Sequence, residues 1–395
     1  MFLISLNTVY YYTGLIALIS CETKITMKKY LLLISVIVWG ISPNPVFAQK
    51  LKPYFDKAEY KELLYISTKT NTPDSVVFNI PAPKHHKRIY RSDVIGLDNR
   101  WDLWINDNNS VAVISIRGTT GNAVSSLANL YAAMVPAKGE LILSKTDTFK
   151  YNLAPDNQAA VHVGWLLSMV LLSEDIVPRI DSLYDSGIKD FVLMGHSQGG
   201  AINYLLTAYL YSLQRQQLLP ADIRFKTYCS AAPKPGNLFF AYYYESITKS
   251  WAFNVVNSAD WVPETPISIQ TLADFNETNL FKSAKSDIEK LKFPKNIILK
   301  QIYNKLDKPT KKAQQRYEKY LGKMTSKVIK KKLPDFSPPE YVESNNYVRT
   351  GRFVVLYADE DYFKKFPKNS KDISVHHNFK PYLYLLEKLK DNSSR

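Results

Sequence analysis

One serine of this 395-residue chain stands among glycines in the stretch GHSQGGA. Gly195 and Gly199 lie two positions before and after Ser197, which is the G-x-S-x-G spacing of a nucleophile elbow. An apolar run, residues 191–194, precedes the serine, and good helix formers, residues 201–210, follow it. In such a sharp turn, side chains at the two glycine positions would collide with neighbouring elements. The pattern predicts a nucleophilic Ser197, and the alternative is a glycine-rich turn without chemistry.

A serine hydroxyl needs a base within hydrogen-bond reach and a group that orients this base. The chain has six histidines. The two best candidates lie in a loop between the last predicted strand and the last predicted helix, where enzymes with a nucleophile elbow carry the base. These two are His376 and His377. Of the other four, His85 and His86 lie in an early loop, and His196 lies inside the elbow. His162 precedes a predicted helix, and a structural role is predicted for it.

The orienting acid is expected at a strand end between the nucleophile and the base. Asp260 directly follows the predicted strand WAFNVVN. Three further carboxylates, Asp359, Glu360 and Asp361, follow the predicted strand RFVVLY. Position along the chain leaves these alternatives open.

Strands and helices alternate along the chain around these residues. The predicted strands are residues 89–97, 101–105, 111–116, 191–194, 225–230, 251–256 and 352–357. The predicted helices are residues 55–66, 161–184, 201–210 and 382–389. This order is typical of an α/β fold with a doubly wound, mostly parallel sheet.

A basic segment, residues 275–345, interrupts this alternation before the last strand. Residues 282–332 contain 17 Lys and Arg against four acids, so much of the net charge of +15 is concentrated here. Apolar residues at helical spacing predict two amphipathic helices, separated at Lys308–Pro309. The insertion is interpreted as a solvated charged cap or as a contact with anionic lipid headgroups. Nucleic-acid binding is disfavoured, because no recognition motif accompanies the lysines.

The N-terminus carries an export signal. Residues 27–48 combine two lysines, a short apolar run and a small-residue site, which predicts a secretory signal peptide cleaved near Ala48. Residues 1–26 are then an upstream extension. A lipoprotein attachment site at Cys21 is disfavoured, since a better-formed signal follows it. The mature protein is therefore expected to be exported, periplasmic or secreted, with residues 49–395 forming one domain.

The mature chain keeps one cysteine, Cys229, so no intramolecular disulfide is expected. No stretch after the signal peptide reaches 18 uninterrupted apolar residues, and no membrane span is predicted.

Six stretches resemble, in order and in local wording, the class 3 lipase family of fungal lipase-like α/β-hydrolases. They are SIRGTT, VHVGW, GHSQGGA, YCSAAPKPGN, NVVNSADWVPETP and HNFKPYL. The resemblance covers residues 87–270 and 347–389. It implies an α/β-hydrolase fold with Ser197 as nucleophile, Asp260 as acid and His377 as base, because His377 begins the H-N-x-x-x-Y-L wording.

The resemblance also implies an oxyanion hole formed by the backbone N–H groups of Thr119 and Gln198. Gln198 stands where many relatives have leucine, and CSAAPKPGN replaces the usual F-G-x-P wording. The family often has a lid within the interval 121–160. Here Leu127, Leu130, Tyr131 and Met134 stand at helical spacing, and the alternative to a lid is an ordinary surface helix. Residues 238–244, LFFAYYY, are interpreted as core packing, with an acyl pocket as the alternative.

The sequence thus predicts a serine ester hydrolase that cleaves acyl esters of lipids through an acyl-enzyme, without metal or organic cofactor. The alternatives are a phospholipase A1-like activity on anionic phospholipids and a non-catalytic protein of the same fold that binds lipid surfaces. The expected partners are the acyl-ester substrate and an anionic membrane surface, and no nucleic acid. The acyl chain, the headgroup and the oligomeric state are left open.

Overall fold

A computed structural model describes residues 50–73 and 79–390 of the chain. These residues belong to one compact unit, Gln49–Arg395. The predicted signal peptide, its cleavage site at Ala48 and the lipoprotein alternative at Cys21 lie outside the described residues.

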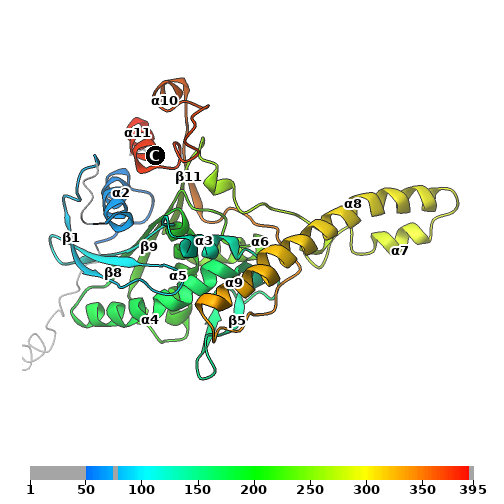
Figure 1. The fold of residues 1–395 in the computed structure, drawn as a ribbon, viewed down its shortest axis with the longest axis horizontal. Coiled ribbons are helices and arrows are strands. Elements are labelled where there is room, and N and C mark those ends of the chain that lie inside the picture. Colours follow the sequence, from blue (N-terminus) through cyan, green and yellow to red (C-terminus); the bar gives the residue numbers. More distant parts are fainter. Residues whose placement is uncertain (1–49, 74–78, 391–395) are drawn as a thin grey trace, which may run out of the picture. The chain divides into compact units, whose positions relative to one another are not determined.

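A seven-stranded sheet forms the centre of this unit, in the order β1-β2-β3-β8-β9-β10-β11 (Figure 1). The strands are β1 (His86–Arg91), β2 (Trp101–Asn106), β3 (Val111–Ile116), β8 (Asp190–His196), β9 (Arg224–Ser230), β10 (Ala252–Asn257) and β11 (Arg352–Leu356). The pairs β1–β2 and β2–β3 are antiparallel, and the remaining pairs are parallel. The predicted mostly parallel sheet of an α/β-hydrolase fold is confirmed, although β1 begins and ends earlier than the predicted strand 89–97.

Helices cover both faces of the sheet. One face packs against α4 (Val163–Asp185), α5 (Gln198–Arg215) and α6 (Leu238–Thr248), and the other against α2 (Lys57–Asn71) and α11 (Phe379–Lys388). Consecutive strand side chains point to opposite faces. Ile114 therefore lies in the first core, and its neighbour Val113 lies in the second. Burial on both faces explains why the central strands are apolar at nearly every position.

The segment between β3 and α4 forms a short helix and four short strands. It contains α3 (Ala123–Leu130) and the strands β4 (Met134–Pro136), β5 (Lys138–Ile142), β6 (Thr148–Asn152) and β7 (Ala160–His162). The helical spacing expected to reach Met134 is wrong at its end. Met134 pairs with His162 across β4 and β7 and is buried, so tertiary pairing replaces the last helical turn.

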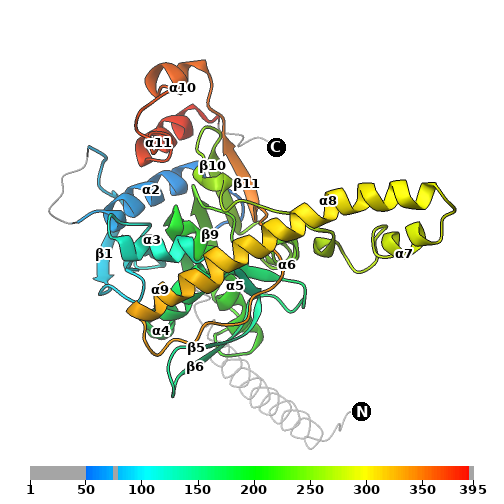
Figure 2. The ribbon, with the colours of Figure 1, turned by 45° about the vertical axis from the view of Figure 1, so that its right-hand side comes forward.

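The Lys-rich insertion between β10 and β11 is helical, as predicted. It contains α7 (Ala284–Glu289), α8 (Lys295–Glu318), a π-helical turn (Lys319–Met324) and α9 (Thr325–Lys332). The predicted break at Lys308–Pro309 is wrong, because α8 continues through Pro309 (Figure 2). The carbonyl that loses its partner to the proline belongs to Lys305, which is exposed, so water can satisfy it. The Thr310 hydroxyl adds a hydrogen bond to the Asp307 carbonyl at 2.8 Å.

Three short helices complete the described part: η1 (Val262–Glu264), η2 (Leu272–Asp274) and α10 (Glu360–Lys365). None of the helices in the described ranges is long and apolar enough to cross a membrane.

Candidate active site

Ser197 occupies a strained turn between β8 and α5. Its backbone has φ 60° and ψ −129°, which a residue with a side chain rarely adopts. A Cβ on Gly195 would lie 2.3 Å from the backbone of Gly199, and a Cβ on Gly199 would lie 2.3 Å from the Ile116 carbonyl oxygen of β3. Both contacts are too short for carbon, so the steric reason predicted for the two glycines is confirmed.

Asp260 and His377 are joined by a hydrogen bond. His377 Nδ1 lies 2.8 Å from Asp260 Oδ2, which also accepts a hydrogen bond from the Tyr382 hydroxyl at 2.8 Å. The Val262 N–H donates to Oδ1 of the same carboxylate at 3.0 Å. Burial by itself raises the pKa of Asp260, but these donors outweigh it, with His377 first, and the pKa lies below its usual value. Asp260 is therefore an anion that binds the Nδ1 edge of the imidazole.

The competing carboxylates have structural contacts instead. Asp359 caps α10 through the Tyr362 N–H and pairs with Lys388. Asp361 pairs with Lys364 on the surface. Among the described residues, the carboxylates after RFVVLY make no hydrogen bond to a histidine.

His376, the neighbour of the candidate base, points elsewhere. Its Nδ1 lies 2.7 Å from the Tyr362 hydroxyl, which also accepts a hydrogen bond from Asn257 Nδ2 at 2.8 Å. The Tyr362 proton is therefore donated to His376. Burial lowers the pKa of His376. The structure thus gives the two adjacent histidines different partners, and His377 is the one on the buried acid.

His162, His85 and His86 make contacts away from the elbow. His162 caps α4, stacks on Trp165 with ring centroids 3.6 Å apart, and has its pKa lowered to about 3 by burial. His85 and His86 lie near Asp107 and Glu62, outside the elbow. The structural role predicted for His162 is confirmed by these contacts.

His196 fixes the loop that carries His377. Its Nε2 donates to the His377 carbonyl at 2.8 Å, so its Nδ1 must accept, and the Ser230 hydroxyl at 3.0 Å donates to it. The Tyr60 hydroxyl then donates to Ser230 Oγ at 2.6 Å. Burial lowers the pKa of His196 to about 3, which keeps the ring neutral and this donor order intact. This series of hydrogen bonds is not visible in the sequence, because its members are far apart along the protein.

His377 also lies beside the elbow. Its ring centroid is 5.0 Å from that of His196, the residue before Ser197. Within the described residues, the Ser197 hydroxyl makes no hydrogen bond. The structure therefore brings Asp260 and His377 together beside the elbow, and in its described part His377 makes no hydrogen bond to Ser197.

Two backbone N–H groups in or beside the elbow have no acceptor among the described residues. The Gly118 N–H donates to Asn71 Oδ1 at 2.7 Å, and the Thr120 N–H donates to Ser125 Oγ at 3.1 Å. In the described ranges, the N–H groups of Thr119 and Gln198 have no acceptor. A Cβ on Gly118 would lie 3.6 Å from Ser197 Cβ, so the loop with Thr119 runs beside the serine. These are the two amides that the resemblance implies for the oxyanion hole.

Asn129 of α3 connects the side chains of these two residues. Its Nδ2 donates to Thr119 Oγ1 at 2.9 Å, and its Oδ1 accepts from Gln198 Nε2 at 2.8 Å. Trp165 Nε1 donates to the same Oδ1 at 3.0 Å. Gln198 is thus used as a hydrogen-bonding side chain where many relatives have leucine. Sequence reasoning missed Asn129, and the polar residue at position 198 was the available signal.

We expect Asn129→Ala to lower kcat for a soluble ester by about tenfold with little change in KM. The reason is that Thr119 and Gln198 lose their common anchor, a smaller loss than the 10²–10³ caused by removing an oxyanion donor itself. Steady-state kinetics with p-nitrophenyl butyrate measure the effect. The matched control is Asn122→Ala, which removes the N-cap of the same helix without touching either amide. Equal losses in both variants would mean that helix stability alone matters.

The candidate lid helix α3 is tightly held in this conformation. A Cβ on Gly164 of α4 would lie 2.1 Å from the Ala128 carbonyl oxygen, so the two helices touch backbone to backbone. Gln198 Nε2 also donates to the Ser125 carbonyl of α3 at 3.0 Å. These contacts fit the alternative of an ordinary surface helix, and lid motion stays a prediction.

The aromatic run at residues 238–244 begins α6. Phe240 and Tyr244 are fully buried in the core that includes Tyr204 of α5. The core interpretation is confirmed for Phe239, Phe240, Ala241 and Tyr244, whereas Tyr242 is exposed.

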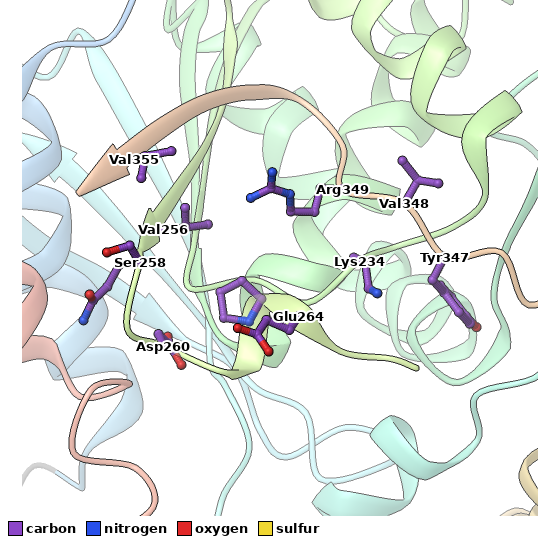
Figure 3. A pocket seen from close by; sticks show the side chains of 11 residues that line it. Lys234, Val256, Ser258, Asp260, Glu264, Tyr347, Val348, Arg349 and Val355 are labelled. Atoms are coloured by element: carbon purple, nitrogen blue, oxygen red, sulfur yellow. The ribbon is translucent and has the colours of Figure 1, made fainter. Parts of the chain in front are cut away.

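A cavity of about 560 Å³ lies beside Asp260, at the carboxyl ends of β10 and β11 (Figure 3). Val256 and Val355 line its apolar side, and Lys234 and Arg349 line its polar side. Burial first, and then the nearby Arg349, lower the pKa of Lys234 to about 8. Asp260 lines this cavity, whereas Ser197 and His377 do not. In the described part of the chain, no group of three or more His, Cys, Asp or Glu side chains is placed to hold a metal ion.

Solved structures of several lipases resemble the described fold at low similarity. The Rhizomucor miehei lipase propeptide complex is 21% identical, with 54% of this chain and 65% of that chain covered and a TM-score of 0.41. The lipase from Rhizopus microsporus var. chinensis is 23% identical, with 57% and 76% covered and a TM-score of 0.38. Lip2 lipase from Yarrowia lipolytica is 17% identical, with 55% and 76% covered and a TM-score of 0.41. This chain thus spans just under two thirds of the Rhizomucor miehei protein.

A comparison with curated proteins found no match. The model of the family Lipase (class 3) matches residues 113–269, the segment from β3 to the loop after η1. The match includes the elbow, the amides at positions 119 and 198, and Asp260. Over residues 113–269, this chain is therefore similar to the class 3 lipase family.

Proposed function

We propose that this protein is a serine ester hydrolase that cleaves acyl esters of lipids through an acyl-enzyme. The observation that carries the proposal is the hydrogen bond between His377 Nδ1 and buried Asp260, beside the strained Ser197. This arrangement has the parts of a Ser-His-Asp triad.

In this mechanism, His377 Nε2 accepts the proton as Ser197 Oγ forms a bond to the ester carbonyl carbon. Asp260, held as an anion, stabilises the imidazolium that results. The free N–H groups of Thr119 and Gln198 donate to the oxyanion of the tetrahedral intermediate. The imidazolium then returns its proton to the departing alcohol, which leaves an acyl group on Ser197. Water, deprotonated by His377, releases the acid in the second half.

A reaction with a fluorophosphonate probe tests this proposal. The probe phosphonylates an activated serine, so we expect one label per chain and none in Ser197→Ala. Hydrolysis of p-nitrophenyl butyrate, triolein and phosphatidylglycerol then defines the substrate class. Labelling that persists in Ser197→Ala contradicts Ser197 as the nucleophile. An unlabelled parent protein that hydrolyses none of the three esters contradicts the proposal and favours a non-catalytic lipid-binding protein.

A phospholipase A1-like activity is the second candidate. The Lys-rich insertion supports it, because lysines attract anionic phospholipid headgroups. Faster hydrolysis of phosphatidylglycerol than of triolein would favour it. We also propose export of the protein, on the strength of the N-terminal sequence alone.

A further inference from the structure

The Lys-rich insertion exposes an unusual number of large apolar side chains. Nine of the 25 exposed large hydrophobic residues in the described ranges fall within residues 280–306. They are Leu280, Phe281, Leu291, Phe293, Ile297, Ile298, Leu299, Ile302 and Leu306. Three of them are 70% or more exposed: Leu280 at 88%, Phe293 at 78% and Leu306 at 70%. Proteins in water rarely leave apolar side chains clustered in this way unless the surface binds something.

Part of this cluster forms a stripe on α8. Ile298, Ile302 and Leu306 follow one another at intervals of four residues, which places them on one face of the helix. All three are at least half exposed, so the protein does not cover this face. Figures 1 and 2 show α7 and the first half of α8 extending away from the sheet. We call residues 280–312 the arm.

The arm also carries a dense positive charge. It contains ten lysines and three acidic residues. The acids pair with Lys290, Lys300 and Lys311. In the described structure the other seven lysines make no ion pair: Lys282, Lys285, Lys292, Lys295, Lys305, Lys308 and Lys312. Their charge is therefore available to an anionic partner.

We propose that the arm docks the protein on an anionic phospholipid membrane. Its apolar side chains enter the boundary between headgroups and acyl chains, and its lysines contact the headgroup phosphates. Seven of the nine exposed residues are leucine or isoleucine, which gain from burial among acyl chains but cannot stack on nucleic-acid bases. A second copy of the chain is a poor partner, because two strongly positive arms repel each other. The docking goes beyond the proposed ester hydrolysis and does not require it.

Vesicle co-sedimentation in a Ser197→Ala background tests the docking without hydrolysis of the lipid. The parent is expected to bind phosphatidylglycerol–phosphatidylcholine vesicles at low salt and phosphatidylcholine vesicles far more weakly. The triple variant Ile298→Gln, Ile302→Gln and Leu306→Gln keeps the charge and the helix propensity. It is expected to bind at least about tenfold more weakly, since its stripe no longer gains from leaving water.

The contribution of the charge is tested with the triple variant Lys292→Gln, Lys295→Gln and Lys305→Gln. A loss on the order of 100-fold is expected, because each lysine near an anionic surface is worth about fivefold in binding. The matched control is Lys138→Gln, Lys145→Gln and Lys150→Gln, which removes the same charge from exposed positions on the β5–β6 hairpin. This control is expected to bind within about twofold of the parent.

Several results would overturn the docking. The first is that the stripe variant binds as tightly as the parent, or that the hairpin control loses as much binding as the lysine variant. The second is that the parent binds phosphatidylcholine vesicles equally well, or binds RNA more tightly than vesicles. The third is that the parent is a dimer and that the stripe substitutions dissociate it. Circular dichroism confirms that each variant is folded. Hydrolysis of p-nitrophenyl butyrate by the arm variants with Ser197 intact is expected to equal that of the parent. A parent without this hydrolysis would contradict the proposed function while leaving the binding result to decide the docking.

Discussion

Ser197→Ala and His377→Ala should each lower the turnover of p-nitrophenyl butyrate by about a million-fold, to the level of the residual background. The first substitution removes the atom that attacks the ester. The second removes the imidazole that takes its proton, and Asp260 cannot replace it, because the carboxylate is buried against the histidine loop. The two losses are not additive, since the nucleophile and the base act as one unit.

His376→Ala is the matched control for this prediction. His376 is adjacent to the candidate base but bonds to Tyr362, so most of the activity should survive its removal. Thermal unfolding checks that the loop remains in place. An equal loss in both histidine variants would leave the base unassigned, and retained activity in His377→Ala would falsify the triad.

Asp260→Asn should lower kcat by about 10⁴-fold with a modest effect on KM. The amide preserves the size of the side chain but removes the charge that stabilises the imidazolium. It also allows the imidazole to take the wrong tautomer, with its acceptor nitrogen turned away from the serine. Because the amide oxygen introduced at this position can still accept the hydrogen bond from the Val262 N–H, the loop should keep its position. Pre-steady-state acylation with p-nitrophenyl butyrate measures the chemical step directly.

Asp359→Asn provides the comparison. Asp359 competes with Asp260 in the sequence, yet it caps α10 and pairs with Lys388, so its replacement should cost stability and little activity. A 10⁴-fold loss in this variant, together with an active Asp260→Asn, would reverse the assignment of the acid.

The network behind the elbow explains why the site needs more than three side chains. The chain from Tyr60 through Ser230 to His196 ends on the His377 carbonyl and holds the histidine loop. On the other side of the serine, Asn129 holds Thr119 and Gln198. The hydrogen bonds through His196 and the bond between Asn129 and Gln198 are buried or half-buried, where such bonds favour one arrangement. The bond from Asn129 to Thr119 is exposed. The acid–base pair and the candidate oxyanion donors are thus positioned separately.

The amino-acid sequence by itself determined the features that depend on local spacing. Gly195 and Gly199 around Ser197 predicted a crowded turn. The clash at Gly195 is local, with the backbone of Gly199, whereas the clash at Gly199 is with Ile116 of β3. The apolar runs predicted the strands and their burial on both faces, since side chains alternate with a period of two. The basic insertion before the last strand was equally visible in composition.

The tertiary structure decided which distant residues meet. Spacing left four carboxylates and two histidines open, and the contact between Asp260 and His377 appears only when the ends of β10 and the loop before α11 come together. Two expectations from local sequence were wrong for tertiary reasons. Helix α8 continues through Pro309, where solvent is available to the freed carbonyl, and Met134 pairs in β4 where continuation of α3 was expected. Whether a lysine or an isoleucine of the arm is covered depends on what packs against it. That is a property of the folded surface and cannot be derived from the order of residues along one helix.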